Sequence, residues 1–236
     1  MTDVLTDFDA VATKLLPPNP GVLKAIGLNH GLESAIADLV DNSIDASAGR
    51  VLVRFVVRGG LVKQLLVVDN GCGMDTATID SAMQLGKPKV GSPGALGHFG
   101  MGLQAASFSQ ASELTVLSRG RGIPAEGRRM LRESQGSGFS VEVLAEEQVA
   151  PALEELWSEF ATESGTVIRW DAIRTFPESK DRSVTNTFVE TKVGELRHHL
   201  GLMFHRLLEQ KRFTIEIDVF DVDEGEAGFP FLVEPI

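Results

Sequence analysis

The segment 38–46 places a carboxylate and a carboxamide one helical turn apart. At 100° per residue, Asp38, Asn42 and Asp45 fall on one face of a helix and Asp41 points away, toward solvent. Oxygen ligands of this kind can share a hydrated Mg²⁺ and a water molecule. The alternative is the solvated polar face of an ordinary amphipathic helix, and this motif alone does not decide between the two.

A second motif, 69–74, directly follows an apolar run and reads Asp69, Asn70, Gly71, Cys72, Gly73, Met74. A carboxylate at a strand end can accept a hydrogen bond from an exocyclic amine, and glycines let the backbone turn sharply and approach a flat ring. The alternative is a plain β-turn, because Asn-Gly is a common turn dipeptide. On this motif alone we favour the turn.

The third motif opens a predicted helix and contains Gly97, His98, Phe99, Gly100, Met101 and Gly102. Glycines free the backbone N–H groups to face phosphates, and the start of a helix adds partial positive charge. His98 fits either a phosphate contact or an exposed spacer. The motif lacks the preceding strand of a dinucleotide fingerprint and the Gly-Lys-Ser/Thr ending of a P-loop.

The elements that must position these motifs follow from periodicity and turn signals. Strands and helices do not alternate throughout, which favours a mixed or antiparallel sheet with helices on one face. A Gly59-Gly60 hairpin joins two β-rich runs at 51–58 and 61–68. The other expected elements are an N-terminal arm (1–20), helices at 31–48, 75–85, 100–110 and 186–210, strands at 112–119, 141–144, 165–170 and 213–219, a loop at 86–99 and a loop or exposed hairpin at 120–138. The helix at 31–48 is expected to bury a stripe made of Leu32, Ile36, Leu39, Val40 and Ser43.

Composition limits the class of protein. The chain has 236 residues, 43% of them hydrophobic, and a net charge of −11. This charge argues against direct nucleic-acid binding by phosphate neutralisation. No apolar run is long enough to span a bilayer, and the N-terminus does not resemble a secretory signal. The single cysteine, Cys72, excludes an intrachain disulfide, so a reducing cytoplasm is expected.

Taken together and in order, the three motifs resemble the N, G1 and G2 boxes of the GHKL superfamily, which includes gyrase B, the heat-shock chaperones, histidine kinases and MutL. Gly165-Thr166 resembles the family's late Gly-Thr strand. The local sequence around Asn42 and the Gly-rich stretch before Gly97 look most like those of the MORC group and its bacterial relatives. The resemblance covers 21–170 by motif, and 186–219 is similar to the closing helix and strand of the chaperone domain.

This resemblance implies a single α+β domain over 1–236, with a Bergerat-type two-layer sandwich that binds ATP and Mg²⁺. Asp69 would bind adenine with Thr166 behind it, and Asn42 would ligate Mg²⁺. The segment 86–99 would be the ATP lid, with Lys87 and Lys89 as phosphate contacts. Gly71 and Gly73 would shape the adenine pocket, and Gly97, Gly100 and Gly102 would free backbone amides for the phosphates. The remaining nucleotide-binding candidates are Asp45, Met74, His98, Phe99 and Met101.

One departure concerns catalysis. The family's general base is usually glutamate, and Asp38, which stands at that position, is one methylene shorter. ATP binding should survive this change, while hydrolysis is expected to be slow.

Three functions therefore stay open. The leading one is an ATP-driven switch in which nucleotide closes the lid and promotes homodimerisation through the N-terminal arms. The second is a nucleotide-binding module without turnover. The third is a histidine-kinase catalytic domain. Two observations argue against it: no phospho-acceptor helix precedes the first motif, and His30 lies too close to that motif to serve as the phospho-acceptor.

Overall fold

The two β-rich runs form neighbouring strands in the interior of the sheet. The computed structural model describes residues 5–17, 31–84, 102–135, 139–158, 162–179 and 181–236. Strands β2 (Arg50–Arg58) and β3 (Leu61–Asp69) pair antiparallel. Gly59 and Gly60, between them, have φ of 60° and 73°, the left-handed conformation that a tight hairpin turn requires. The predicted hairpin is confirmed.

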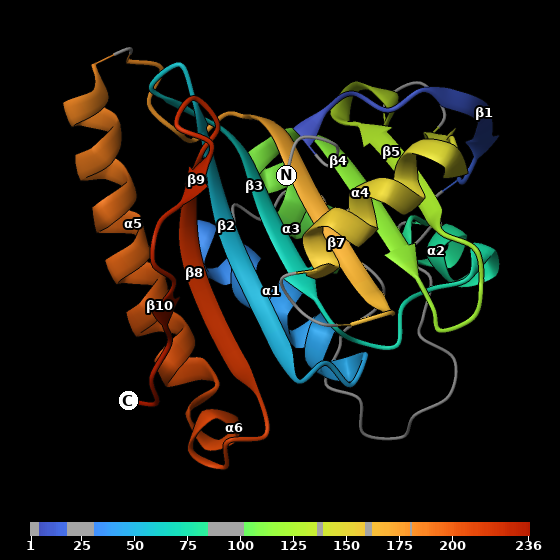
Figure 1. Ribbon diagram of the computed structural model, residues 1–236. Helices are drawn as coiled ribbons and strands as arrows, with labels where there is room; N and C mark the ends of the chain where they lie inside the picture. Colours follow the sequence, from blue (N-terminus) through green and yellow to red (C-terminus); the bar gives the residue numbers. More distant parts are fainter. Residues whose placement is uncertain (1–4, 18–30, 85–101, 136–138, 159–161, 180) are drawn as a thin grey trace.

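These strands belong to one large sheet, in the order β1-β6-β5-β4-β7-β3-β2-β8-β10, with β9 paired to β8 (Figure 1). Among the described pairs, β2 and β8 run parallel and the others antiparallel. The further strands are β1 (Ala10–Leu15), β4 (Ala111–Arg119), β5 (Glu126–Leu131), β6 (Ser140–Leu144), β7 (Gly165–Ile173), β8 (Thr214–Asp221), β9 (Glu226–Ala227) and β10 (Phe231–Leu232).

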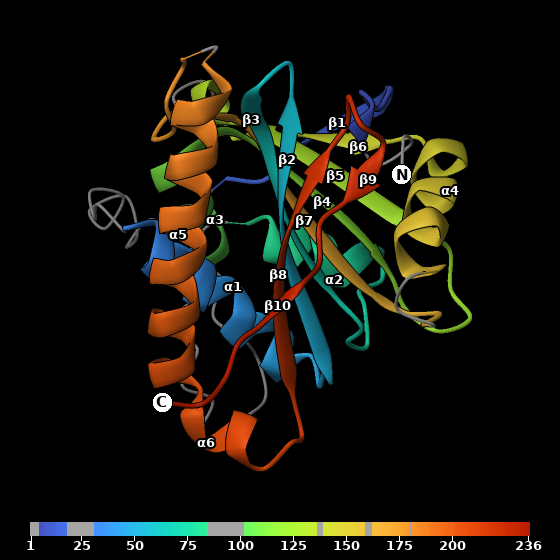
Figure 2. The ribbon, with the colours of Figure 1, turned by 60° about the vertical axis from the view of Figure 1, so that its left-hand side comes forward.

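The main apolar core lies between this sheet and a layer of helices. Along β2, Val51, Val53 and Phe55 point into that core, while Leu52 and Val56 point to the opposite face. Figure 2 shows α1, α3 and α5 together on one side of the sheet. The helices that contribute to this core are α1 (Leu32–Asp45), α2 (Thr76–Ala82), α3 (Gly102–Gln110), α5 (Arg182–Met203) and α6 (His205–Glu209). The predicted α+β class with a mixed, largely antiparallel sheet is confirmed.

One helix, α4 (Glu146–Ser158), packs on the other face of the sheet (Figure 2). Its residues Val149, Leu153 and Trp157 join a second apolar cluster that includes Leu5 and Phe8 from the start of the chain. This helix was not predicted from the sequence, and Pro151 inside it is a residue that ordinarily signals a helix break.

Other segments differ from expectation. Part of the segment expected to be a loop or exposed hairpin, 120–138, is strand β5, in which Arg128 and Met130 are buried, followed by a 3₁₀ turn at Arg132–Gln135. The helix expected at 186–210 begins earlier, where the Asp181 side chain caps it, and breaks into α5 and α6. Within the N-terminal arm, β1 pairs with β6.

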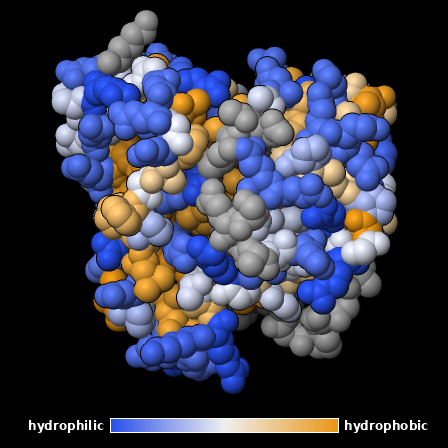
Figure 3. Space-filling model, in the orientation of Figure 1, coloured by the Kyte–Doolittle hydropathy of each residue, from blue (hydrophilic) through white to orange (hydrophobic). Residues whose placement is uncertain are grey.

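The edge of the sheet at β10 presents apolar side chains to solvent. Phe231 and Leu232 are 46% and 49% exposed, and Phe229 just before them is 93% exposed. In Figure 3, apolar surface appears on the side where Figure 1 places β8, β9 and β10.

A buried ion pair joins the parallel strands. Arg54 of β2 donates from Nε and Nη2 to the two carboxylate oxygens of Asp218 on β8, at 2.8 and 2.6 Å. The side chains are only 2% and 4% exposed. Two parallel N–H···O bonds are the strongest geometry for such a pair, but both charges have left water to form it.

Removal of one partner should therefore cost much more than replacement of both. We expect Asp218→Leu to lower the free energy of unfolding by about 3–5 kcal/mol, and the double variant Arg54→Met/Asp218→Leu to recover most of that loss. Urea unfolding measures both. As the control, Arg182→Met in the exposed pair with Asp221 (3.0 Å) should cost no more than about 1 kcal/mol. If Asp218→Leu is as stable as the control Arg182→Met, this account is wrong.

Candidate functional site

The carboxylate of Asp69, at the end of β3, is the centre of the site. It is 5% exposed and accepts hydrogen bonds from three places in the chain. Oδ1 accepts from the backbone N–H groups of Gly71 (2.8 Å) and Thr166 (3.2 Å), and Oδ2 accepts from the hydroxyl of Ser43 (3.1 Å). The second motif, α1 and β7 therefore meet at one side chain.

Burial shifts the pKa of this carboxylate. Loss of water raises the pKa of Asp69, and the hydrogen bonds from Gly71, Ser43 and Thr166 oppose that rise without cancelling it. Oδ1 has two donors and Oδ2 has one, so Oδ2 retains capacity to accept a further N–H group.

Two glycines near Asp69 are required by close backbone approach. A Cβ on Gly73 (φ 70°) would lie 2.0 Å from the carbonyl oxygen of Arg119, and one on Gly165 (φ 150°) would lie 2.0 Å from that of Asp69. Both positions combine a steric block with a conformation that other residues avoid. A Cβ on Gly71 would lie 2.9 Å from the carbonyl oxygen of Ala46, at the end of α1. The turn is therefore held tightly between α1, β4 and β7.

Ser118 on β4 supports the same turn from behind. Strand register places Asp69, Thr166 and Ser118 side by side on β3, β7 and β4. The Ser118 hydroxyl accepts from the N–H of Met74 at 2.9 Å and lies 2.9 Å from the hydroxyl of Thr166. Thr166 thus reaches Asp69 through its backbone amide, while its hydroxyl faces Ser118. No sequence motif pointed to Ser118, and Ser43 was expected only as a packing residue.

The polar residues of α1 lie beside this centre. The apolar positions of the helix, together with Ser43, are buried as predicted. Asp38 and Asn42 are half-buried, and Asp45 is exposed. Asp41, expected to face solvent, is half-buried as well. Among the described residues, the Asn42 carboxamide has no hydrogen-bond partner, so its oxygen is available to a ligand.

Helix α3 begins at Gly102 and packs against α1. Among the described residues, a Cβ on Gly102 would meet nothing within 4 Å, so their packing does not require glycine there. The rest of the third motif and the predicted lid lie outside the described residues: Lys87, Lys89, Gly97, His98, Phe99, Gly100 and Met101.

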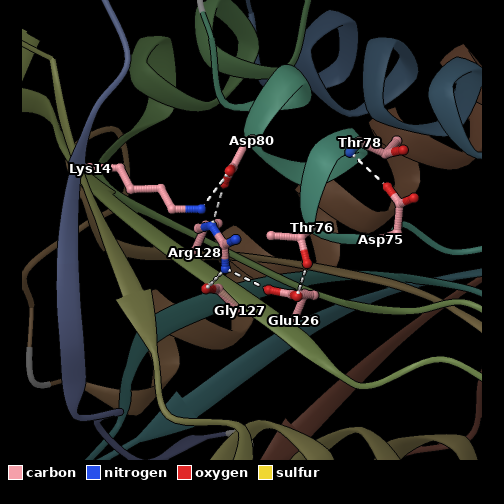
Figure 4. A network of polar contacts seen from close by, with 8 residues as sticks. All are labelled: Lys14, Asp75, Thr76, Thr78, Asp80, Glu126, Gly127 and Arg128. Carbon is pink, nitrogen blue, oxygen red and sulfur yellow. Dashed lines mark hydrogen bonds and ion pairs between the residues drawn. The ribbon is translucent and has the colours of Figure 1, made fainter.

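Helix α2 follows the Asp69 turn and is fixed by a charged network (Figure 4). Arg128 of β5, 1% exposed, donates to Asp80 of α2 at 2.7 Å and to Glu126 at 2.8 Å. Lys14 of β1 donates to Asp80 at 2.6 Å, and the Thr76 hydroxyl donates to Glu126. Partial burial acts to raise the pKa of Asp80, but the bonds from Lys14 and Arg128 outweigh it and the pKa lies below its usual range. The network anchors α2 to β5 and to the N-terminal strand.

The described residues offer limited metal-binding capacity. Within them, no three His, Cys, Asp or Glu side chains are grouped closely enough to hold a metal ion. Mg²⁺ is commonly held by one or two protein oxygens together with substrate phosphates, so the Asn42 oxygen suits it without such a group.

Within the described residues, no helix is both long and apolar enough to cross a membrane.

The chain is similar in sequence to several known ATPases and to a DNA repair protein. Residues 30–155 match the family model described as histidine kinase-, DNA gyrase B-, and HSP90-like ATPase. ATPase MORC2 of Homo sapiens is 33% identical over 94 residues, which are 37% of this chain and 9% of that protein. Protein MICRORCHIDIA 5 of Arabidopsis thaliana is 25% identical over 241 residues, 92% of this chain and 30% of that protein.

Two further similarities are more limited. The DNA mismatch repair protein MutL of Pelotomaculum thermopropionicum is 43% identical over 51 residues, 22% of this chain and 8% of that protein. The solved N-terminal domain of a DNA repair protein has a TM-score of 0.48 and 15% identity, over 85% of this chain and 52% of that one. The chain spans less than a third of the length of these curated relatives.

The raised pKa of Asp69 predicts how the chain's stability depends on pH. The folded chain holds the Asp69 proton more tightly than the unfolded chain, so this residue's contribution to the free energy of unfolding falls as pH rises through the folded pKa. Asp69→Asn removes that loss, and its amide can still accept from Gly71 and Thr166 and donate to Ser43. We expect a higher thermal midpoint than wild type at pH 7, with the gap closing at acid pH. Thermal unfolding across pH measures it, and a variant less stable at pH 7 would contradict the assignment.

Proposed function

Because the chain belongs to the histidine kinase-, DNA gyrase B- and HSP90-like ATPase family, we propose that it binds ATP with Mg²⁺, hydrolyses it slowly and acts as a nucleotide-driven switch. The observation that carries the binding proposal is the Asp69 carboxylate. It is buried, held by fixed donors, and keeps capacity on Oδ2 for one more N–H group. The exocyclic amine of adenine supplies such a group, and the turn at Gly71 and Gly73 provides a surface for the ring.

The phosphate side of the proposal rests on α3. No other described residue lies within 4 Å of the place where a side chain of its first residue, Gly102, would stand. The first N–H groups of a helix also lack partners within it. Helix α3 packs against α1, which carries Asn42. Backbone amides of α3 would thus bind the phosphates, and Asn42 would hold the Mg²⁺ that neutralises them.

Hydrolysis requires a group that orients water. Asp38 lies one turn before Asn42 on α1 and is half-buried. In this proposal its carboxylate accepts the proton of the water that attacks the terminal phosphorus, so that ATP and water give ADP and phosphate. The second candidate function is nucleotide binding without turnover, and the short reach of an aspartate favours it.

The switch and dimerisation parts of the proposal rest on the N-terminal strand. Lys14 of β1 is paired with Asp80 of α2, and α2 directly follows the turn that would hold adenine. In this proposal, a structural change in the nucleotide site is transmitted through α2 to β1. Sedimentation with and without a non-hydrolysable ATP analogue tests this part, and an unchanged monomer mass in both conditions would exclude a nucleotide-driven homodimer.

Titration calorimetry with ATP and Mg²⁺ tests binding. Wild type should bind. In Asp69→Asn the Nδ2 group faces the adenine amine, so two donors oppose each other, and affinity should fall roughly tenfold to a hundredfold. Since the same substitution is expected to preserve the fold, thermal unfolding of the variant serves as the control. Equal affinities would remove the adenine assignment.

Phosphate release tests turnover. Asp38→Ala should abolish hydrolysis and leave ATP affinity unchanged, because the carboxylate acts on water. Asp38→Glu should keep or raise the rate, since the longer side chain reaches further toward the phosphate. If Asp38→Ala hydrolyses ATP as fast as wild type, another group is the base. If wild type and Asp38→Glu both release no phosphate above buffer, the chain is a binding module.

A further inference from the structure

Helix α3 is held in place by buried polar side chains. Gln104, Ser107 and Gln110 are 1%, 0% and 2% exposed. The Ser107 hydroxyl accepts from Nε1 of Trp170 on β7 at 2.8 Å, and Oε1 of Gln110 accepts from the Thr175 hydroxyl at 3.0 Å. Hydrogen bonds are directional, so these contacts set the orientation of α3 more strictly than apolar packing does.

Gln104 makes the contact nearest the start of the helix. Its Nε2 donates to the backbone carbonyl of Met83, a buried residue that caps the C-terminal end of α2. Carbonyl groups at a helix end lack partners within the helix, so Met83 offers a natural acceptor. Helix α2 in turn starts immediately after the turn at 69–74, which contains Asp69 and is called the adenine-side turn below. One side chain therefore links the adenine-side turn, through α2, to the first turn of α3.

The other half of the Gln104 amide shows that packing alone does not account for this residue. Oε1 is buried and, among the described residues, has no hydrogen-bond partner. A buried acceptor without a partner is unfavourable, and methionine would fill the same space without it. The residue type is explained by the donor, because only a side chain with an N–H or O–H group can hold the Met83 carbonyl.

We infer that Gln104 is a positioning residue, which sets the first turn of α3 against the adenine-side turn so that its backbone N–H groups meet the phosphates of a nucleotide bound through Asp69. This inference rests on the proposed function. Among the described residues, no hydrogen bond joins Gln104 to Asp69 or to the turn that follows it. Loss of its hydrogen bond to Met83 should therefore weaken the binding of the phosphates and leave the binding of adenine unchanged.

The test compares adenosine with ATP, each titrated by calorimetry into wild type and Gln104→Met. Methionine keeps the volume and removes the donor. We expect the dissociation constant for ATP with Mg²⁺ to rise about tenfold, while that for adenosine stays within about twofold. Gln110→Met is the matched control, because it removes a buried glutamine from the far end of the same helix. It should leave the ratio of the two dissociation constants unchanged.

Gln104→Leu carries the test if Gln104→Met does not fold. Leucine also lacks a donor for the Met83 carbonyl, so the same selective loss of ATP affinity is expected. A ratio unchanged from wild type in the folded variant, or an equal loss for adenosine and ATP, overturns the inference and leaves the proposed function standing. Failure of wild type itself to bind ATP overturns the proposed function and the inference together.

Discussion

The burial of one carboxylate organises this part of the molecule. Asp69 ends an interior strand and has lost most of its contact with water, which is costly for an ionisable group. The cost is offset by donors from Gly71, Thr166 and Ser43, and these come from a turn, a strand and a helix. Because the donors must all reach one side chain, the three elements cannot move independently.

The tight turn after Asp69 follows from the same constraint. To bring its N–H group to Oδ1, Gly71 must lie against the end of α1, and Gly73 must pass within contact of the Arg119 carbonyl. Gly165 makes an equally close approach to the backbone of Asp69 itself. The backbone surface that would contact adenine is thus built without side chains, which suits a flat ring.

The two halves of the candidate site are supported differently. The proposed adenine side is built into the sheet, where strand register places Asp69, Thr166 and Ser118 next to one another. The proposed phosphate side is the start of α3, a helix positioned by polar contacts to α2 and β7. Helix α2 connects the halves, and its ion pairs with Lys14 and Arg128 tie it to the far edge of the sheet. Helix α2 is therefore the element that joins the proposed nucleotide site to the N-terminal strand.

The sequence by itself determined the features that depend on neighbours along the chain. Turn chemistry predicted the Gly59-Gly60 hairpin, and helical periodicity predicted the buried stripe of α1, because both arise within a few residues. The motif residues Asp69, Gly71 and Gly73 were identified for the same reason. Their roles toward a nucleotide stay predictions, as do those of Asp38 and Asn42.

Only the tertiary structure decided which distant groups meet. The Ser43 and Ser118 contacts, the burial of Arg128 in β5 and the parallel pairing of β2 with β8 depend on strand register and on packing between remote segments. Helix α4 contains a proline, which ordinarily signals a break, and it is stabilised by apolar packing in one cluster with Leu5 and Phe8 on the same face of the sheet. Local pattern carries information about period and turns. It carries none about which surfaces pack together, and that choice fixed the surroundings of Asp69.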